Sequence, residues 1–182
     1  MIDLQGKVGN HNVRIFNCYG PQEISQSQRS SSEQQHIVHQ FWTELEKEVI
    51  KAKYEGCLVL IEMDANAKVG NNVIKDDPID ISENAKLFRD FVIRPNLRIL
   101  NASEKCTGSI TRQRVTVNQT EESIIDFIVA CDTLATFFEE MIIDDKRLHV
   151  LTKYALKKGL RKKVQSDHNI LFGKFSLKYC TK

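Results

Sequence analysis

One stretch constrains the fold of this chain more than any other: Leu58-Val59-Leu60-Ile61-Glu62-Met63-Asp64-Ala65-Asn66. Four consecutive large aliphatic residues predict a strand that is buried on both faces. Polar residues follow at its carboxyl end, where an open α/β sheet keeps its ligand crevice. Because Asp64 and Asn66 are separated by one residue, an extended backbone places both side chains on one side, roughly 6–7 Å apart. Such a carboxylate and amide can act together on one water or one phosphate oxygen.

Asp64 and Asn66 also have a purely structural interpretation. Asp and Asn are frequent turn formers, because their side chains bond nearby backbone groups. A calcium-binding EF-hand loop starting at Asp64 is excluded, because Val69 and Lys75 stand where that loop requires a glycine and a glutamate. The choice between a turn and a site therefore depends on the rest of the chain.

Composition indicates one globular domain, since 182 residues with 41% hydrophobic and 27% charged residues suffice for a sizeable core. The net charge of +2 permits a nucleic-acid partner without arguing for one. The five cysteines are scattered and form no Cys-x-x-Cys pair, which favours a reducing intracellular setting and argues against a zinc site. Since no apolar run has membrane-spanning length and no signal-peptide core is present, we expect a nuclear or cytoplasmic protein without a membrane partner.

The apolar pattern predicts strands and helices along the whole chain. Helices are expected at 32–56 and 83–92, with a short one at 134–138. Little precedes Val13 that could form a sheet partner, so we expect the first strand to have an exposed edge, which invites pairing with another chain. Strands are expected at 13–19, 57–61, 97–100, 124–130, 141–143 and 170–177, with strand-like alternation at 110–112 and 115–117.

Two further polar groups stand out against the apolar pattern. Asp126 interrupts a run of Ile, Phe and Val. A buried carboxylate without a partner costs several kcal/mol, so Asp126 is either paired, or at a strand end facing a polar cleft, or an edge-strand residue that faces water. The tripeptide Ser166-Asp167-His168 precedes the last strand. A carboxylate beside an imidazole suits catalysis in which one group holds a metal ion and the other donates to a phosphate oxygen, although the tripeptide alone is not specific.

A basic stretch runs from Lys146 to Lys163 and contains no Asp or Glu. Such a local field can attract phosphates, but solvated lysines on a loop or helix face are equally common. Both interpretations therefore stay open. Its cations are Lys146, Arg147, Lys153, Lys157, Lys158, Arg161, Lys162 and Lys163.

Four segments, in this order, resemble the endonuclease/exonuclease/phosphatase superfamily, which includes pancreatic DNase and the apurinic endonucleases. Residues 17–21 (Asn-Cys-Tyr-Gly-Pro) are similar to the family's strand ending in Tyr-x-Pro, and residues 63–66 (Met-Asp-Ala-Asn) to Gly-Asp-x-Asn. Residues 125–128 (Ile-Asp-Phe-Ile) are similar to Ile-Asp-Tyr-Ile, and residues 166–168 to the closing Ser-Asp-His. The resemblance covers nearly the whole chain. Thr111-Arg112 and residues 166–169 are most similar to the endonuclease domains of non-LTR retrotransposons.

The resemblance implies an α+β fold: a two-layer β-sandwich flanked by helices, in four layers α/β/β/α. Residues 1–182 would form a single domain that corresponds to the C-terminal portion of the family domain. Two departures qualify this expectation. Met63 stands where the family has glycine, and no segment before Tyr19 resembles the family's Gln-Glu-Thr-like motif with its metal-binding glutamate. The resemblance therefore implies a fold that is missing its N-terminal strands.

The activity implied by the resemblance is that of a Mg²⁺-dependent (or Mn²⁺-dependent) endonuclease that hydrolyses the nucleic-acid backbone, DNA above all, within a retrotransposon-like element. Two alternatives remain, namely a catalytically inactive nucleic-acid-binding remnant and a phosphatase of small phosphoesters. Thr111, Arg112, Lys162 and Lys163 are expected to contact nucleic acid. By analogy, Asp64 would activate the attacking water, and Asn66 would hold that water or a phosphate oxygen. Asp126 would orient a protonated His168. Tyr19 would contact the phosphate or leaving group, and Asp167 would bind the metal.

Overall fold

The computed structural model describes residues 1–22, 32–70, 73–74, 83–117, 119–149, 152–157 and 160–176. The polar sequence from residue 71 to 80 also predicts a loop, which lies almost entirely outside these ranges. The helices are α1 (Ser32–Tyr54), α2 (Glu83–Ile93) and α3 (Asp132–Ala135), with a 3₁₀ turn at Leu100–Ala102. The strands are β1 (Ile2–Val8), β2 (His11–Tyr19), β3 (Leu58–Asp64), β4 (Leu97–Ile99), β5 (Cys106–Thr107), β6 (Arg112–Val115), β7 (Thr120–Ser123), β8 (Asp126–Cys131), β9 (Phe138–Ile143), β10 (Thr152–Lys157), β11 (Leu160–Gln165) and β12 (Leu171–Phe175).

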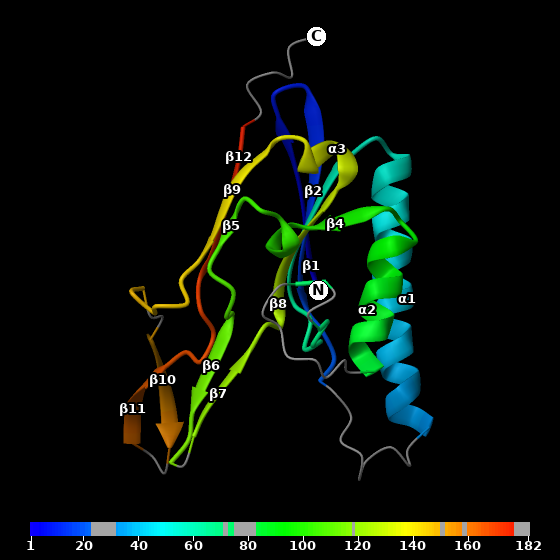
Figure 1. Cartoon of the computed structure of the whole chain (residues 1–182). Helices are drawn as coiled ribbons and strands as arrows, with labels where there is room; N and C mark the ends of the chain where they lie inside the picture. Colours follow the sequence, from blue (N-terminus) through cyan, green and yellow to red (C-terminus); the bar gives the residue numbers. More distant parts are fainter. Residues whose placement is uncertain are drawn as a thin grey trace.

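A five-stranded sheet with the order β1-β2-β3-β8-β4 forms the centre of the molecule. Strands β2 and β3 are parallel, and every other pair in this sheet is antiparallel. The four aliphatic residues that predicted a doubly buried strand lie in β3, which has a neighbour on each side. Helices α1 and α2 lie side by side against one face of this sheet (Figure 1).

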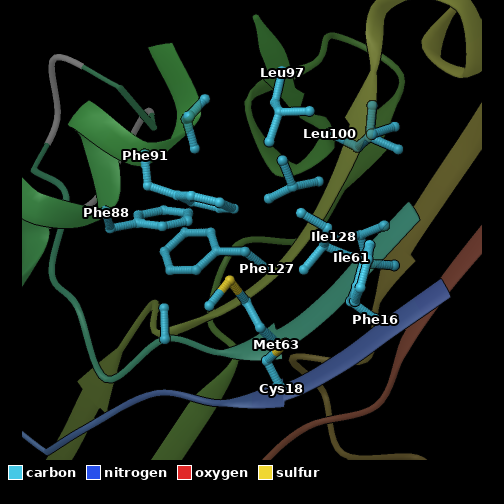
Figure 2. Close-up of a cluster of buried hydrophobic side chains, with 14 of the residues drawn as sticks. Phe16, Cys18, Ile61, Met63, Phe88, Phe91, Leu97, Leu100, Phe127 and Ile128 are labelled. Atoms are coloured by element: carbon cyan, nitrogen blue, oxygen red, sulfur yellow. The ribbon is translucent and has the colours of Figure 1, made fainter. Parts of the chain in front are cut away.

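The face of the sheet beneath the helices carries an aromatic core. Met63 of β3 and Phe127 of β8 are opposite each other in the ladder, so both side chains point to the same face. The ring of Phe127 lies 4.8 Å from that of Phe88 on α2, and Trp42 of α1 lies 5.6 Å from Phe88. Figure 2 shows Met63, Phe127, Phe88 and Phe91 gathered in this cluster. In the sequence, Val38, Phe41, Trp42, Leu45 and Val49 recur at steps of three or four residues, which predicts an apolar stripe on α1, and Trp42 of this stripe packs in the core as expected.

A smaller sheet with the order β12-β9-β5 covers part of the opposite face. Ile128 of β8 lies against Gly173 of β12, where an added Cβ would be 3.4 Å from the Ile128 Cδ1 atom. The α+β class and the two sheets agree with the expected fold. Both long helices of the described residues lie on the same side (Figure 1), so the expected helix layer over the smaller sheet has no counterpart among them.

The expectation that little before Val13 could form a sheet partner was wrong, because a strand does precede Val13. Strand β1 pairs antiparallel with β2 through a turn at Gly9-Asn10, in a register that places Val8 opposite His11. Gly9 has a φ of +60°, which suits the first central residue of a two-residue hairpin turn. Among the described strands, β1 and not β2 therefore lies at this edge of the sheet, and β4 lies at the other.

Several other elements differ from the predicted pattern. The basic stretch forms most of the hairpin β10–β11, in which Lys162 lies opposite Ala155 and Lys163 opposite Tyr154. Strand β7 was not predicted, and only Val115 of the expected strand at 115–117 is in β6. The short helix ends at Ala135, before β9 begins. Among the described helices, none combines the length and apolarity needed to cross a membrane.

Candidate active site

Three neighbouring strands bring polar side chains to one end of the central sheet. Tyr19 is the last residue of β2 and lies opposite Asp64, the last residue of β3. Asp64 lies in turn opposite Asp126, the first residue of the antiparallel strand β8. Because directly opposite residues share a face, the three side chains are on the side away from the helices. The sheet topology thus places three residues that are distant in sequence next to one another in one row.

His168 completes this row from a segment near the end of the chain. Its backbone forms an isolated β-bridge with Arg112. Its Nδ1 atom lies 3.0 and 3.1 Å from the two carboxylate oxygens of Asp126. Its Nε2 atom lies 3.9 Å from Asp64 Oδ2 and 3.9 Å from Asp167 Oδ1. Asp126 is thus paired and at a strand end, and the edge-strand alternative was wrong, because β8 lies between β3 and β4.

The surroundings of the site raise the pKa of both Asp64 and His168. Burial, and then the charge of Asp126, raise the pKa of Asp64 above 3.8, against the opposing effects of the Asn66 N–H, His168 and Arg112. The hydrogen bond to Asp126 is the main cause that raises the pKa of His168 above 6.5, with the charges of Asp126, Asp64 and Asp167 outweighing desolvation. Asp64 is therefore a better base than an exposed carboxylate, and His168 a more persistent acid than an exposed histidine.

Asn66 has a structural role in the turn after β3, and its φ of +48° shows that the extended backbone expected from Asp64 to Asn66 was wrong. Its backbone N–H donates to Asp64 Oδ1 at 3.0 Å, and its Nδ2 donates to the Gly20 carbonyl at 3.0 Å. The Gly20 N–H donates to the Asp64 carbonyl at 2.6 Å, and an added Cβ on Gly20 would lie 2.7 Å from the Ala65 carbonyl oxygen. The turn-former interpretation was therefore correct, and this turn fixes the ends of β2 and β3 to each other.

Asp167 lies at the rim of the row and is paired with Arg112. Arg112 Nε donates to Asp167 Oδ2 at 3.0 Å. Burial alone would raise the pKa of Asp167, but the hydrogen bond from Arg112, a backbone hydrogen bond and the charges of Arg112 and His168 together lower this pKa below 3.8. Asp167 is therefore ionised at neutral pH, with its Oδ1 atom on the side of His168.

The expectation that Thr111 contacts nucleic acid is corrected by its burial. Its exposed fraction is 0%, and its Oγ1 accepts hydrogen bonds from the backbone N–H groups of Ile125 and Asp126 at 2.9 and 3.1 Å. Thr111 therefore positions the start of β8 from inside the protein. The side chains of Lys162 and Lys163 lie outside the described part of the chain, so their contacts remain predictions.

Asn84 on α2 is a positioning residue that the sequence did not reveal. Its side chain is 4% exposed, and Nδ2 donates to the carbonyl groups of Pro21, Ala65 and Asn66 at 2.9–3.1 Å. Its Oδ1 accepts a hydrogen bond from Trp42 Nε1 at 2.7 Å. One amide thus connects the helix layer to the two loops that follow β2 and β3. No local pattern marks this role, because its partners are distant in sequence.

Glu62 is a second residue that sequence reasoning missed. It lies two positions before Asp64, on the same face of β3, and is exposed. A pocket of about 360 Å³ is lined by Glu62, Asp64, Asp126 and Tyr19, together with residues of β2, β8 and β12. The two-residue period of a strand was the signal that could have found Glu62.

The donor atoms of the site fit a divalent cation. Asp64, Asp126 and His168 each offer a ligand atom within 4.8 Å of the others. Both oxygens of Asp126 contact His168, whereas Asp64 Oδ2 and Asp167 Oδ1 face the same Nε2 atom from 3.9 Å. Mg²⁺ prefers oxygen ligands, keeps several waters and needs only one or two carboxylates. The carboxylates of this cluster therefore offer the kind of ligand atom that a divalent cation takes.

No protein-family model matches the chain, and no curated protein is significantly similar to it in sequence. Solved structures nevertheless share its fold. A Neisseria 3′ phosphatase, NExo, bound to a product DNA hairpin superposes with a TM-score of 0.66 at 14% identity, covering 96% of this chain and 64% of that chain. The 3′-5′ exonuclease NExo from Neisseria meningitidis gives a TM-score of 0.62 at 16% identity, covering 90% and 61%. The endonuclease domain of TRAS1, a telomere-specific non-LTR retrotransposon, gives 0.59 at 13% identity, covering 97% and 64%.

The chain has the endonuclease/exonuclease/phosphatase fold, in agreement with the resemblance of its four motifs. It spans less than two thirds of the length of each of these three solved structures. At such low identities the likeness concerns the fold, and the chemistry has to be argued from the residues of the site.

Proposed function

We propose that this chain is a Mg²⁺- or Mn²⁺-dependent hydrolase that cleaves phosphodiester bonds of the nucleic-acid backbone as an endonuclease. The observation that carries the proposal is the position of His168. Asp126 holds one ring nitrogen, and the other ring nitrogen lies 3.9 Å from both the Asp64 and the Asp167 carboxylates. This arrangement offers an acid, a base and cation ligands around one point.

His168 acts in this proposal as the hydrogen-bond donor to the phosphate. Because its Nδ1–H bonds to Asp126, the ring orientation is fixed and Nε2 lies 3.9 Å from Asp64 Oδ2. The raised pKa of His168 favours the imidazolium form more than in an exposed histidine. Its Nε2–H donates to a non-bridging phosphate oxygen, where negative charge develops as water attacks.

Asp64 acts as the base that takes a proton from the attacking water. Its side chain is 12% exposed, and its pKa is raised mainly by burial. The water oxygen forms a bond to phosphorus while the bond to the leaving oxygen breaks and that oxygen keeps the electron pair. Because Asn66 Nδ2 is bonded to Gly20, Asn66 orients the water through its Oδ1 atom. Placement of this kind supplies most of the catalysis of phosphate-ester hydrolysis.

The remaining polar residues surround this centre. When bound, a divalent cation would stabilise the negative charge on the phosphate oxygens, and Asp167 would hold it. Tyr19 is 61% exposed at the end of β2 and contacts the phosphate or the leaving group. Arg112 is held by Asp167 and is partly exposed, so it adds positive charge beside the pocket.

DNA is the proposed substrate, and a retrotransposon-like element the proposed origin. The likeness to the TRAS1 endonuclease fold supports both, and the cations of the basic stretch 146–163 support a nucleic-acid substrate. We further propose that residues 1–182 form one domain, equivalent to the C-terminal portion of the family domain, and that the protein works in the nucleus or cytoplasm. A phosphatase is the second candidate, because the neighbour with a TM-score of 0.66 is described as a 3′ phosphatase.

Nicking of supercoiled plasmid DNA tests the proposal. Wild-type protein should nick in Mg²⁺ and stop when the cation is chelated. His168→Ala should lower the rate by roughly 10²–10⁴-fold, the usual contribution of a positioned acid or base. His36→Ala is the matched control, because His36 is exposed on α1 behind the sheet, and it should nick at the wild-type rate.

The other candidates give different results in the same experiment. A phosphatase would release phosphate from a soluble phosphomonoester without nicking the plasmid. An inactive remnant would bind DNA in a salt-sensitive manner and cleave neither substrate. Equal nicking by wild type and His168→Ala would show that the activity comes from another site or a contaminant.

A further inference from the structure

Strand β1 is the most exposed regular element of the central sheet. All seven of its residues are exposed, including Ile2 at 59%, Leu4 at 55% and Val8 at 42%. It pairs with β2 along one edge, and no strand within the described ranges pairs with its other edge. An edge strand with alternating apolar side chains and unpaired backbone groups is a template for another strand.

The turn geometry determines which backbone groups of β1 point outward. The pair Val8–His11 flanks a two-residue turn, so these residues exchange both backbone hydrogen bonds. Such pairs alternate along an antiparallel ladder, so Leu4 and Gly6 also bond to β2. The N–H and C=O groups of Asp3, Gln5 and Lys7 therefore point away from β2, toward the open edge.

The same three residues make this edge complementary to itself. When two copies of β1 run antiparallel with Gln5 opposite Gln5, Asp3 of each copy lies opposite Lys7 of the other. Twofold symmetry creates this attractive pair twice. All three pairs fall at positions whose backbone groups point outward, so they can form the hydrogen-bonded pairs of the new ladder. On the other face, Ile2 of each copy lies opposite Val8 of its partner, which brings exposed apolar side chains together.

We propose that β1 is a self-association surface through which two copies of this chain pair antiparallel, in the register centred on Gln5. The two central sheets then form one continuous sheet. Because the twofold axis of such a pairing is perpendicular to the sheet, both helix layers lie on one side and both candidate active sites on the other. This inference does not depend on the proposed hydrolase activity.

Sedimentation equilibrium of the full chain tests this surface directly. Wild type should shift from its 20.9 kDa monomer toward twice that mass as its concentration rises to about 1 mM. Gln5→Pro should remain monomeric, because proline removes the outward N–H at the centre of the new ladder. Its own pairing with β2 does not use that N–H, and edge strands accept proline at such positions. Gln5→Ala is the matched control and should dimerise like wild type.

Charge variants test the register. Lys7→Glu places like charges opposite each other twice and should weaken the dimer about tenfold. Asp3→Lys does the same with two positive charges. An equimolar mixture of the two variants should dimerise again, because in the mixed dimer positions 3 and 7 carry opposite charges at both contacts. Circular dichroism checks that Asp3→Lys folds, since Asp3 also bonds to Arg14.

Amide hydrogen exchange provides a readout that needs no variant. Raising the wild-type concentration should slow exchange at Asp3, Gln5 and Lys7 and leave Leu4 and Gly6 unchanged. A chain that stays monomeric at every concentration would overturn the proposal. So would a dimer that survives Gln5→Pro, or one that is insensitive to Lys7→Glu, because it must use another surface or another occupant of the edge.

Discussion

The two faces of strands β3 and β8 carry different kinds of side chain. On the helix side, Met63 and Phe127 pack among the aromatic rings of α1 and α2 (Figure 2). One residue away along each strand, Asp64 and Asp126 face the pocket and contact His168. The apolar face has many interchangeable contacts, whereas the polar face depends on a few specific ones. Strand alternation thus lets adjacent residues serve stability and chemistry separately.

The largest expected effect on stability comes from the helix-side face. Phe127→Ala should lower the free energy of unfolding by about 3–5 kcal/mol, because it removes a fully packed ring next to Phe88. Denaturant unfolding monitored by circular dichroism measures this. A loss below about 1 kcal/mol would show that the aromatic core is not the main source of stability.

A smaller loss is expected where the two faces are connected. Asn84→Ala should cost about 2–3 kcal/mol, because it leaves the Trp42 N–H and the carbonyl groups of the two site loops without their partner. It should also slow nicking, since these loops carry the ends of β2 and β3. The same denaturant titration, with exposed Asn12→Ala as the control, measures it. If Asn84→Ala were as stable and as active as wild type, Asn84 would not connect the helix layer to the loops of the site.

The smallest expected effect is a change in protonation on the polar face. Asp126→Asn should lower the pKa of His168 toward 6.5, because the hydrogen bond to Asp126 is the main cause of its rise. Since the folded-state pKa of His168 is raised, the pair stabilises the fold fully below 6.5 and loses this contribution as the pH rises through the folded value. Titration of metal-free protein by NMR measures the shift. An unchanged His168 pKa would contradict the observed pairing.

Sequence patterns predicted the helix-side face better than the pocket side. Four aliphatic residues in β3 and the apolar stripe of α1 were sufficient to place the core, because burial leaves a periodic signal. Asp126 was recognised because a carboxylate in an apolar run needs a partner. Strand β1 was missed because none of its residues is buried, so the alternation of its apolar and polar residues does not mark a side that faces the core. Thr111 and Asn84 act through hydrogen bonds between distant segments, which no local pattern records.

Asp64 and Met63 offer the most direct test of the central claim that adjacent residues of β3 serve chemistry and stability separately. The account predicts that Asp64→Asn lowers Mg²⁺-dependent plasmid nicking at least about 100-fold. Its free energy of unfolding should be unchanged or higher, because burial already disfavours the charged form of Asp64. Met63→Ala should lower the free energy of unfolding by about 2–5 kcal/mol while each folded molecule nicks at nearly the wild-type rate. Wild-type nicking by Asp64→Asn would contradict the account.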